Sequence, residues 1–225
     1  MRAMILAAGL GKRLRPLTER LPKALVEVGG KPLIEHHIEK LAAAGIRELV
    51  INVSWLGEQL EHRLGQGARL GVDIRWSREP EPLETGGGIR QALALLGSQP
   101  FALISADVWS DYDYGCLPRT LKDGACAHLI LVPNPPHHPM GDYRLTTDGW
   151  VRSAEAGQPS LTFSGIAVVA PALVQGFPAG ATFPLRDALA AALVDDSVSG
   201  EVHSGRWSDV GTPQRLAALR AVLGA

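Results

Sequence analysis

The sequence predicts an α/β protein with an open, mostly parallel, Rossmann-like sheet flanked by helices. Short apolar and β-branched runs alternate with amphipathic helical segments along the first half of the chain. A turn that contains two glycines follows directly after the first apolar run. The 225 residues are enough to bury a substantial core, and no internal repeat or linker divides them. We therefore expect one domain over residues 1–225, with a small β-rich insertion.

Composition excludes several classes of partner. The formal net charge is −1 and 46% of residues are hydrophobic, so no global field draws the chain to nucleic acid or to an anionic membrane. No apolar run approaches the roughly 18 residues that a membrane-spanning helix needs. The first apolar run is too short for a signal peptide and is followed by Lys12, Arg13 and Arg15. We expect a cytoplasmic protein with no nucleic-acid or membrane partner.

The first half of the chain predicts alternating strands and helices. β-Branched residues dominate the expected strands, whereas apolar residues recur at helical spacing in the segments between them. Pro32 suits a first helical turn and Gly45 suits a helix end. The expected strands are residues 4–7, 48–54, 72–76 and 101–107, and the expected helices are residues 31–45, 57–64 and 84–96.

The second half is less regular. Gly165 interrupts an apolar strand, which predicts a bulge or a close approach of the backbone to a ligand. Asp148 and Gly149 suit the turn of a hairpin. The expected strands are residues 127–132, 143–145, 151–153 and 161–169, with a stiff loop at 134–139 and helices at 184–194 and 213–223.

The glycine turn after the first strand predicts a phosphate-binding loop. Gly9 and Gly11 lack a Cβ, so backbone N–H groups there can approach a phosphate chain. Arg13 and Lys23 add cations nearby, and such a cluster suits a polyphosphate. Leu14 occupies the third glycine position of a dinucleotide fingerprint, and the Gly-Lys-Ser/Thr of a P-loop is absent. The two glycines alone would equally suit an ordinary strand-to-helix turn with solvated basic residues.

This region resembles the signature of the nucleoside-diphosphate-sugar pyrophosphorylases, also called sugar-1-phosphate nucleotidyltransferases. The matching residues are Gly9-x-Gly11-x-Arg13, Pro16-Leu-Thr18 and Pro22-Lys23, and Ala24 departs from the proline of the family pattern. The resemblance implies transfer of a nucleotidyl group from a nucleoside triphosphate to a sugar 1-phosphate, with Arg13 and Lys23 as catalytic residues. The implied nucleotide-binding residues are Ala8, Gly9, Gly11, Lys12, Arg13, Lys23, Glu84, Gly86 and Gly87.

Two aspartates are the candidate metal ligands. Asp107 follows a buried strand, where it could also cap the next element. Asp209 precedes Gly211 in a segment similar to the second acidic motif of the family. The resemblance implies that both carboxylates hold Mg²⁺, a hard ion that suits oxygen ligands.

The helix expected at 84–96 begins with three glycines. Each costs about 1 kcal/mol relative to alanine in a helix, so we expect them to serve a purpose. The resemblance places this loop against the nucleobase, with Gly86 and Gly87 as contacts and Glu84 nearby. Thr85 could at the same time cap the helix.

Two further segments resemble the walls of the family's sugar pocket. They are residues 140–143, where Asp142 would bond sugar hydroxyls, and residues 163–166. Many members carry a lysine that binds the sugar phosphate, where this chain has Ala156. Which cation of this chain binds that phosphate is therefore an open question. The implied sugar-binding set is Asp107, Gly141, Asp142, Glu155, Ser164 and Gly165.

Within the family, segments across nearly the whole chain resemble the branch that uses UTP and N-acetylmuramic acid 1-phosphate. They are residues 83–89, 106–109, 111–113, 141–143 and 163–166. The chain stops soon after Asp209, which leaves no room for the β-helix domain of bifunctional relatives, so we expect a monomer. Another pair, such as GTP with mannose 1-phosphate, is the alternative, and a non-catalytic nucleotide-sugar-binding regulatory protein is a second one.

Overall fold

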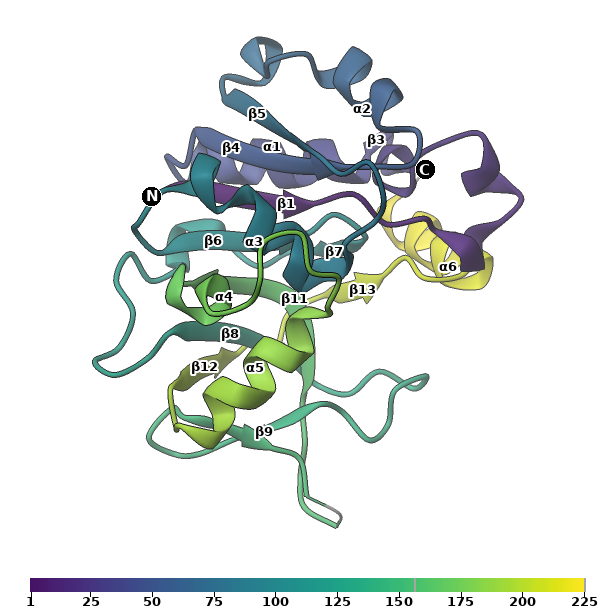
Figure 1. The fold of residues 1–225 in the computed structure, drawn as a ribbon. Helices are drawn as coiled ribbons and strands as arrows, with labels where there is room; N and C mark the ends of the chain where they lie inside the picture. Colours follow the sequence, from purple (N-terminus) through teal and green to yellow (C-terminus); the bar gives the residue numbers. More distant parts are fainter. Residues whose placement is uncertain (156, 225) are drawn as a thin grey trace.

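The computed structural model describes residues 1–155 and 157–224, and its centre is a seven-stranded sheet with helices on both faces (Figure 1). The strand order is β12-β8-β11-β6-β1-β4-β5. β11 runs antiparallel to both neighbours and the other pairings are parallel, which confirms the mostly parallel α/β fold. The strands are β1 (Ala3–Leu6), β4 (Glu48–Val53), β5 (Asp73–Arg78), β6 (Phe101–Ser105), β8 (Ala127–Val132), β11 (Thr162–Val169) and β12 (Val198–Val202).

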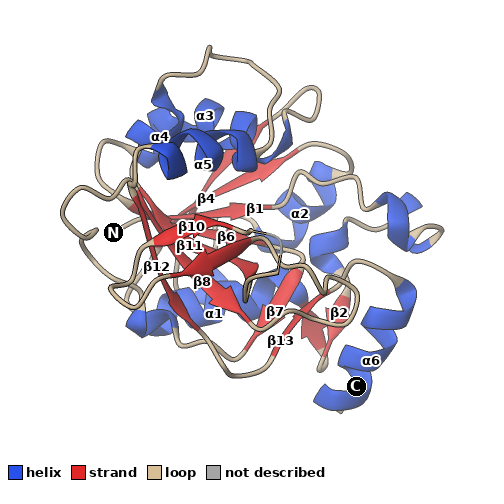
Figure 2. Cartoon of the chain, turned by 90° about the horizontal axis from the view of Figure 1, so that it is seen from below, coloured by secondary structure: helices blue, strands red, loops and turns tan. Residues whose placement is uncertain are grey.

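Helices cover the two faces of the sheet as separate layers, as Figure 2 shows. Ile5 of β1 packs into the core on the side of α1 and α2, whereas the preceding Met4 packs on the side of α3 and α5. Both faces of the strand are therefore buried, as its continuous apolar sequence predicts. The helices are α1 (Leu33–Ala43), α2 (Gly57–Leu64), α3 (Glu84–Leu96), α4 (Ala172–Gln175), α5 (Leu185–Val194) and α6 (Pro213–Leu223).

The segments between the main strands and helices contain a small hairpin and several single-turn helices. Helix α6 contacts the small hairpin of β2 (Glu27–Val28) and β3 (Lys31–Pro32). None of the helices in residues 1–155 and 157–224 is both long and apolar enough to cross a bilayer. The single-turn 3-10 helices are η1 (Lys12–Leu14), η2 (Leu17–Glu19), η3 (Lys23–Leu25), η4 (Ala68–Leu70) and η5 (Tyr114–Cys116).

The β-rich insertion is a hairpin at the β12 end of the sheet (Figure 1). Its strands are β9 (Tyr143–Leu145) and β10 (Val151–Ser153), with the bounds that the sequence predicted. A bridge between Trp150 and Ser199 attaches the hairpin to the edge strand β12. The strands on either side of it in sequence, β8 and β11, belong to the main sheet.

A bulge in β11 confirms the expectation for Gly165. The pairing register with β8 shifts between Phe163 and Ile166. Gly165 has a φ of +80°, and a Cβ at this position would lie 2.9 Å from the side chain of Ser105. A glycine is therefore required both by the backbone conformation and by the close approach of β6.

Replacing Gly165 with alanine is expected to lower the free energy of unfolding by about 3 kcal/mol, because left-handed strain and a steric clash add. Gly124 has a φ of +82° and open space where a Cβ would lie, with no atom within 4 Å, so Gly124→Ala isolates the strain, about 1 kcal/mol. Urea denaturation of both variants measures the difference. Equal losses in the two variants would show that β6 does not constrain the bulge.

A second strand pair brings the two candidate metal ligands together. β7 (Val108–Ser110) pairs antiparallel with β13 (Trp207–Asp209), and Asp209 stands opposite Val108 in the register. The N–H of Val210 donates to the carbonyl of Asp107 over 2.8 Å. Asp107 and Asp209, about a hundred positions apart in the sequence, therefore lie close together at the end of β6.

Candidate active site

Two adjoining cavities open at the carboxyl ends of β1 and β6, the edge at which ligands bind in parallel α/β sheets. The large cavity has a volume of about 690 Å³ and the small cavity about 410 Å³. The two cavities are continuous in their walls, because the same six residues line both. The shared residues are Leu6, Arg13, Glu84, Thr85, Ser105 and Asp107.

The glycine turn forms one wall of the small cavity. Gly11 has a φ of +59°, and its carbonyl accepts a 2.8 Å hydrogen bond from the hydroxyl of Thr18. A Cβ on Gly11 would lie 2.8 Å from the Thr18 methyl group, so the turn requires glycine there. No Cβ contact constrains Gly9, which leaves its backbone open to the cavity. The predicted nucleotide-binding residues that line this cavity are Ala8, Gly9, Gly11, Lys12, Arg13, Lys23 and Glu84.

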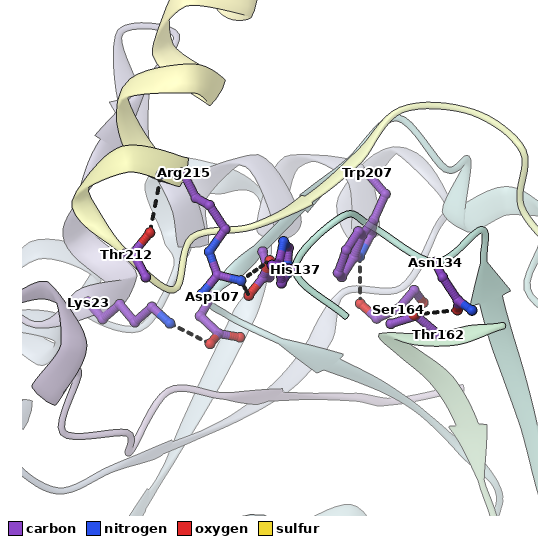
Figure 3. A network of polar contacts seen from close by, with 10 residues as sticks. Lys23, Asp107, Asn134, His137, Thr162, Ser164, Trp207, Thr212 and Arg215 are labelled. Atoms are coloured by element: carbon purple, nitrogen blue, oxygen red, sulfur yellow. Dashed lines mark hydrogen bonds and ion pairs between the residues drawn. The ribbon is translucent and has the colours of Figure 1, made fainter. Parts of the chain in front are cut away.

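Lys23 and Asp107 form an ion pair at the boundary between the cavities (Figure 3). The Lys23 ammonium lies 2.5 Å from Oδ2 of Asp107. The Lys23 side chain is only 12% exposed, whereas that of Asp107 is 43% exposed. The carboxylate therefore remains accessible from the large cavity while it neutralises the largely buried lysine.

Asp209 is held by an arginine and a histidine that the sequence did not single out for it. Nη1 of Arg215 lies 2.7 Å from Oδ2 of Asp209, and Nε2 of His137 lies 3.0 Å from Oδ1. Figure 3 shows Arg215 and His137 pointing toward the same place beside Asp107. His137 belongs to a proline-rich loop and Arg215 to the first turn of α6, so neither carries a recognisable motif.

The two aspartates fit a divalent cation. Both line the large cavity, and the pairing of β7 with β13 places them side by side. Across residues 1–155 and 157–224, no group of three His, Cys, Asp or Glu side chains has the geometry of a metal site. Carboxylate oxygens and substrate phosphates are the ligands that Mg²⁺ uses when it lacks a protein cage. The donor set therefore suits Mg²⁺ bound together with a phosphate ligand.

Four of the predicted sugar-binding residues line the large cavity, namely Asp107, Asp142, Ser164 and Gly165. Asp142 accepts hydrogen bonds from the backbone N–H of Phe163 over 2.8 Å and from His138 over 3.0 Å. Ser164 lies at the bulge, where its carbonyl accepts a 2.8 Å bond from the Trp207 indole. The bulge at Gly165 thus turns this strand end toward the cavity.

The structure does not bring Gly141 and Glu155 into either cavity wall. Gly141 has a φ of +59° and packs against the Asn134 side chain, so it serves the turn that carries Asp142. Glu155 is exposed after β10 and pairs with Arg144 at 3.2 Å. The expected contact of Glu155 with the sugar stays a prediction. Ala156 lies outside the described residues.

Gly86 and Gly87 pack closely against other segments of the chain, and their expected contact with the nucleobase stays a prediction. A Cβ on Gly86 would collide with the ring of Phe183, and one on Gly87 would collide with the carbonyl of Ala181. Both N–H groups donate to the Phe183 carbonyl, over 2.9 Å and 3.1 Å. Neither glycine lines the large or the small cavity. Close packing of α3 on the segment before α5 therefore explains these glycines, while Glu84 and Thr85 face the cavities.

A buried polar network at the floor of the small cavity was not predicted. Oδ1 of Asn52 accepts from the N–H of Ala7 over 2.9 Å, and its Nδ2 donates to Glu79 over 2.7 Å. The other oxygen of Glu79 accepts from the N–H of Leu83 over 3.0 Å. Asn52 is 2% exposed and Glu79 4% exposed. The network connects the glycine turn to the loop before α3. Asn52, a polar residue inside the apolar run at 49–53, was the one sign of this network in the sequence, because a buried polar side chain needs hydrogen-bond partners.

Comparison with known proteins identifies the family. The family model described as "Nucleotidyl transferase" matches residues 2–145. A Neisseria meningitidis serogroup B protein named N-acetylmuramate alpha-1-phosphate uridylyltransferase is 48% identical over 229 residues, covering 100% of this chain and 99% of the relative. The chain belongs to the nucleotidyl transferase family. This confirms the family that the sequence motifs indicated.

Two further comparisons extend this result. A protein of the same name from Caulobacter vibrioides is 36% identical and covers 98% of this chain and 96% of its own. A solved structure of a candidate glucose-1-phosphate thymidylyltransferase from Bacillus anthracis has a TM-score of 0.86 at 21% identity, covering 99% of this chain and 95% of that one. The structural likeness supports the fold of this nucleotidyl transferase.

His37 positions the backbone beside Asp107 in this nucleotidyl transferase. Nε2–H of the buried ring donates to the carbonyl of Val108 over 2.8 Å, which leaves Nδ1 to accept from the Tyr114 hydroxyl over 2.7 Å. Burial lowers the pKa of His37 to about 4, so the ring is neutral at pH 7. A neutral ring from α1 therefore holds the strand that follows Asp107.

The depressed pKa of His37 predicts acid-sensitive stability. The unfolded chain binds a proton at this ring near pH 6.5 and the native state only near pH 4, so the contribution is complete above pH 6.5 and is lost as pH falls toward 4. At pH 5 the native state loses about 2 kcal/mol relative to pH 7 from this group. Urea denaturation at both pH values should show a smaller pH dependence in His37→Gln than in wild type, whereas the exposed His62→Gln should match wild type. If the free energy of unfolding of His37→Gln changed with pH as much as that of wild type, a neutral, buried His37 would be contradicted.

Proposed function

We propose that the protein transfers a uridylyl group from UTP to N-acetylmuramic acid α-1-phosphate and releases pyrophosphate. The observation that carries the reaction class is the meeting of two cavities at Asp107, with Lys23 on one side and Asp209 on the other. Support for the substrate pair comes from the two relatives of that name, which align over almost the whole chain. We further propose that the protein acts as a cytoplasmic monomer.

In the proposed reaction the phosphate oxygen of the sugar 1-phosphate attacks the α-phosphorus of UTP in line. A new oxygen–phosphorus bond forms as the bond to the β-phosphate oxygen breaks, and no protein nucleophile is needed. Lys23 stabilises charge on the α-phosphate, because its ammonium lies where the cavities meet. Arg13 lines both cavities and stabilises the departing pyrophosphate. The glycine turn, Lys12 and Glu84 complete the proposed nucleotide site.

Asp107 and Asp209 are the proposed Mg²⁺ ligands. When bound, Mg²⁺ would supply Lewis-acid neutralisation of phosphate charge. Lys23 and His37 keep the Asp107 segment in place, since one contacts the carboxylate and the other the adjacent backbone. Arg215 and His137 orient Asp209.

The large cavity is the proposed sugar site. Asp142 is fixed by the N–H of Phe163, which leaves its carboxylate able to accept bonds from sugar hydroxyls. Ser164 and Gly165 present the edge of β11 to the same space. Glu155 lies outside this wall and pairs with Arg144, so the proposed sugar site does not include it.

A substrate panel tests the proposal. UTP, GTP, CTP, ATP and dTTP would each be combined with the 1-phosphates of N-acetylmuramic acid, N-acetylglucosamine and mannose, with pyrophosphate release as the readout. We expect the highest kcat/KM for UTP with N-acetylmuramic acid 1-phosphate. A higher value for GTP with mannose 1-phosphate would replace the substrate assignment. Tight nucleotide binding without turnover of any pair would instead favour the regulatory alternative.

A further inference from the structure

The basic side chains divide between the two cavities. Lys12 and Lys23 line the small cavity, Arg186 and Arg215 line the large cavity, and Arg13 lines both. A phosphate bound in the large cavity needs a cation from that side. Arg186 is 81% exposed at its side chain, whereas Arg215 is 18% exposed. Arg215 is therefore the partly desolvated guanidinium of the large cavity, where a charge-assisted bond is strongest.

The residues around Arg215 fix the position of its side chain. The Arg215 backbone N–H donates to Oγ1 of Thr212, the residue that caps α6. Gly211 has no side chain, and the space that its Cβ would need is occupied by the Arg215 guanidinium. Any larger residue at 211 would displace the guanidinium. The turn between β13 and α6 thus fixes Arg215 beside Asp209 rather than leaving it in solvent.

The guanidinium has donors that the protein does not use. Nη1 contacts both carboxylate oxygens of Asp209, at 2.9 Å and 2.7 Å. Nε of Arg215 is buried and has no acceptor among the residues that the structure describes. Asp209 contacts only Nη1, so the other N–H groups of the guanidinium remain available to a ligand in the large cavity that Arg215 lines. A forked guanidinium suits the tetrahedral oxygens of a phosphate.

We propose that Arg215 binds the phosphate of the sugar 1-phosphate, using donors that Asp209 leaves free. This inference rests on the proposed function and answers the question that Ala156 raised, namely which cation holds that phosphate. His137 and His138 also line the large cavity, but each contacts an aspartate through Nε2 and neither offers the forked donors of a guanidinium. Arg215 therefore recognises the acceptor phosphate and orients it beside the carboxylates.

The competing role for Arg215 is that of a counter-ion for Asp209 alone. The two roles predict different losses in Arg215→Gln. Isothermal titration calorimetry in the presence of Mg²⁺ would measure the Kd of N-acetylmuramic acid 1-phosphate, of unphosphorylated N-acetylmuramic acid and of UTP. We expect the Kd of the phosphorylated sugar to rise about 100-fold, because two charge-assisted bonds are lost. The Kd values of the free sugar and of UTP should stay within about threefold of wild type.

Two more variants sharpen the test. Arg215→Lys keeps the charge but loses the fork, so it should weaken binding of the phosphorylated sugar about tenfold. Arg47→Gln removes an exposed arginine outside both cavity walls and should leave all three Kd values near wild type. Circular dichroism and thermal unfolding would confirm that each variant is folded. If Arg215→Gln does not fold, the comparison of Arg215→Lys with wild type carries the test.

Four outcomes are distinguishable. Unchanged affinity for the phosphorylated sugar in Arg215→Gln, or in Arg215→Lys if only that variant folds, would overturn the role of Arg215. A second result would also overturn it: weaker binding of UTP and Mg²⁺, with the ratio of the Kd of the phosphorylated sugar to the Kd of the free sugar unchanged from wild type. That result would assign Arg215 the role of a counter-ion for Asp209. If wild type instead turns over another sugar 1-phosphate, the substrate assignment fails and the same titrations are made with that sugar. Absence of turnover with every sugar 1-phosphate would overturn the proposed function itself.

Discussion

Replacing Asp107 with asparagine is expected to lower kcat/KM for UTP and the sugar 1-phosphate about 1,000-fold. Under the proposed function the variant loses a metal ligand, and it also leaves the Lys23 ammonium, which is 12% exposed, without its counter-charge. Loss of a well-placed electrostatic group costs about 10²–10³ in rate, and here two groups are affected. Pyrophosphate release at saturating Mg²⁺ measures the effect, and Mg²⁺ titration should show weaker apparent metal binding.

Asp123→Asn is a suitable control, because Asp123 is an exposed aspartate outside both cavity walls. We expect that variant to retain wild-type kcat/KM. Turnover of Asp107→Asn within tenfold of wild type would show that this carboxylate is not a ligand of the reacting assembly. Thermal unfolding of each variant separates loss of fold from loss of chemistry.

Replacing Lys23 with methionine is expected to lower kcat about 300-fold with a smaller effect on the KM of the sugar 1-phosphate. Lys23 lines the small cavity and not the large one, so its removal should affect the nucleotide more than the acceptor. Methionine keeps the buried stem of the side chain and removes only the ammonium. Because the proposed role is to stabilise charge that develops on the α-phosphate, the loss should fall mainly on kcat.

Steady-state kinetics with each substrate varied in turn would measure this split. Lys31→Met is the matched control, since Lys31 forms an exposed ion pair with Glu39 and lies outside both cavity walls. A Lys23→Met enzyme with wild-type kcat and only a raised KM for UTP would assign the lysine to uniform binding of the nucleotide.

Local sequence patterns predicted most of the central elements. The hairpin strands at 143–145 and 151–153 and the helices at 57–64 and 84–96 have the predicted bounds, because turn residues or glycines mark their ends. The bulge at Gly165 was also visible, since a glycine within a β-branched run is typical of a bulge or of a close backbone approach. These features depend on residues close together in the chain.

Features that depend on distant contacts were not predicted. β7 and β13 are three residues each and form only because they pair with one another. Gly86 and Gly87 suggested a ligand contact, whereas the neighbour that requires them is the segment around Phe183, about a hundred residues away. Arg215 carries no local signal, because its position follows from Gly211 and from the carboxylate of Asp209. Periodicity reports which face of an element is buried, but not what covers it.

The walls of the two cavities come from different stretches of the chain. The small cavity is lined by residues up to Asp107 together with Gly211, whereas most of the large cavity is lined by residues from Leu103 to Arg215. Under the proposed function, chimeric enzymes that exchange segments such as 137–165 between relatives would acquire a new sugar preference with the original choice of nucleotide. The bulged β11, whose residues 166–169 pair with β6, would have to be transplanted with its loops. Such recombination offers an evolutionary route by which one scaffold could serve many activated sugars.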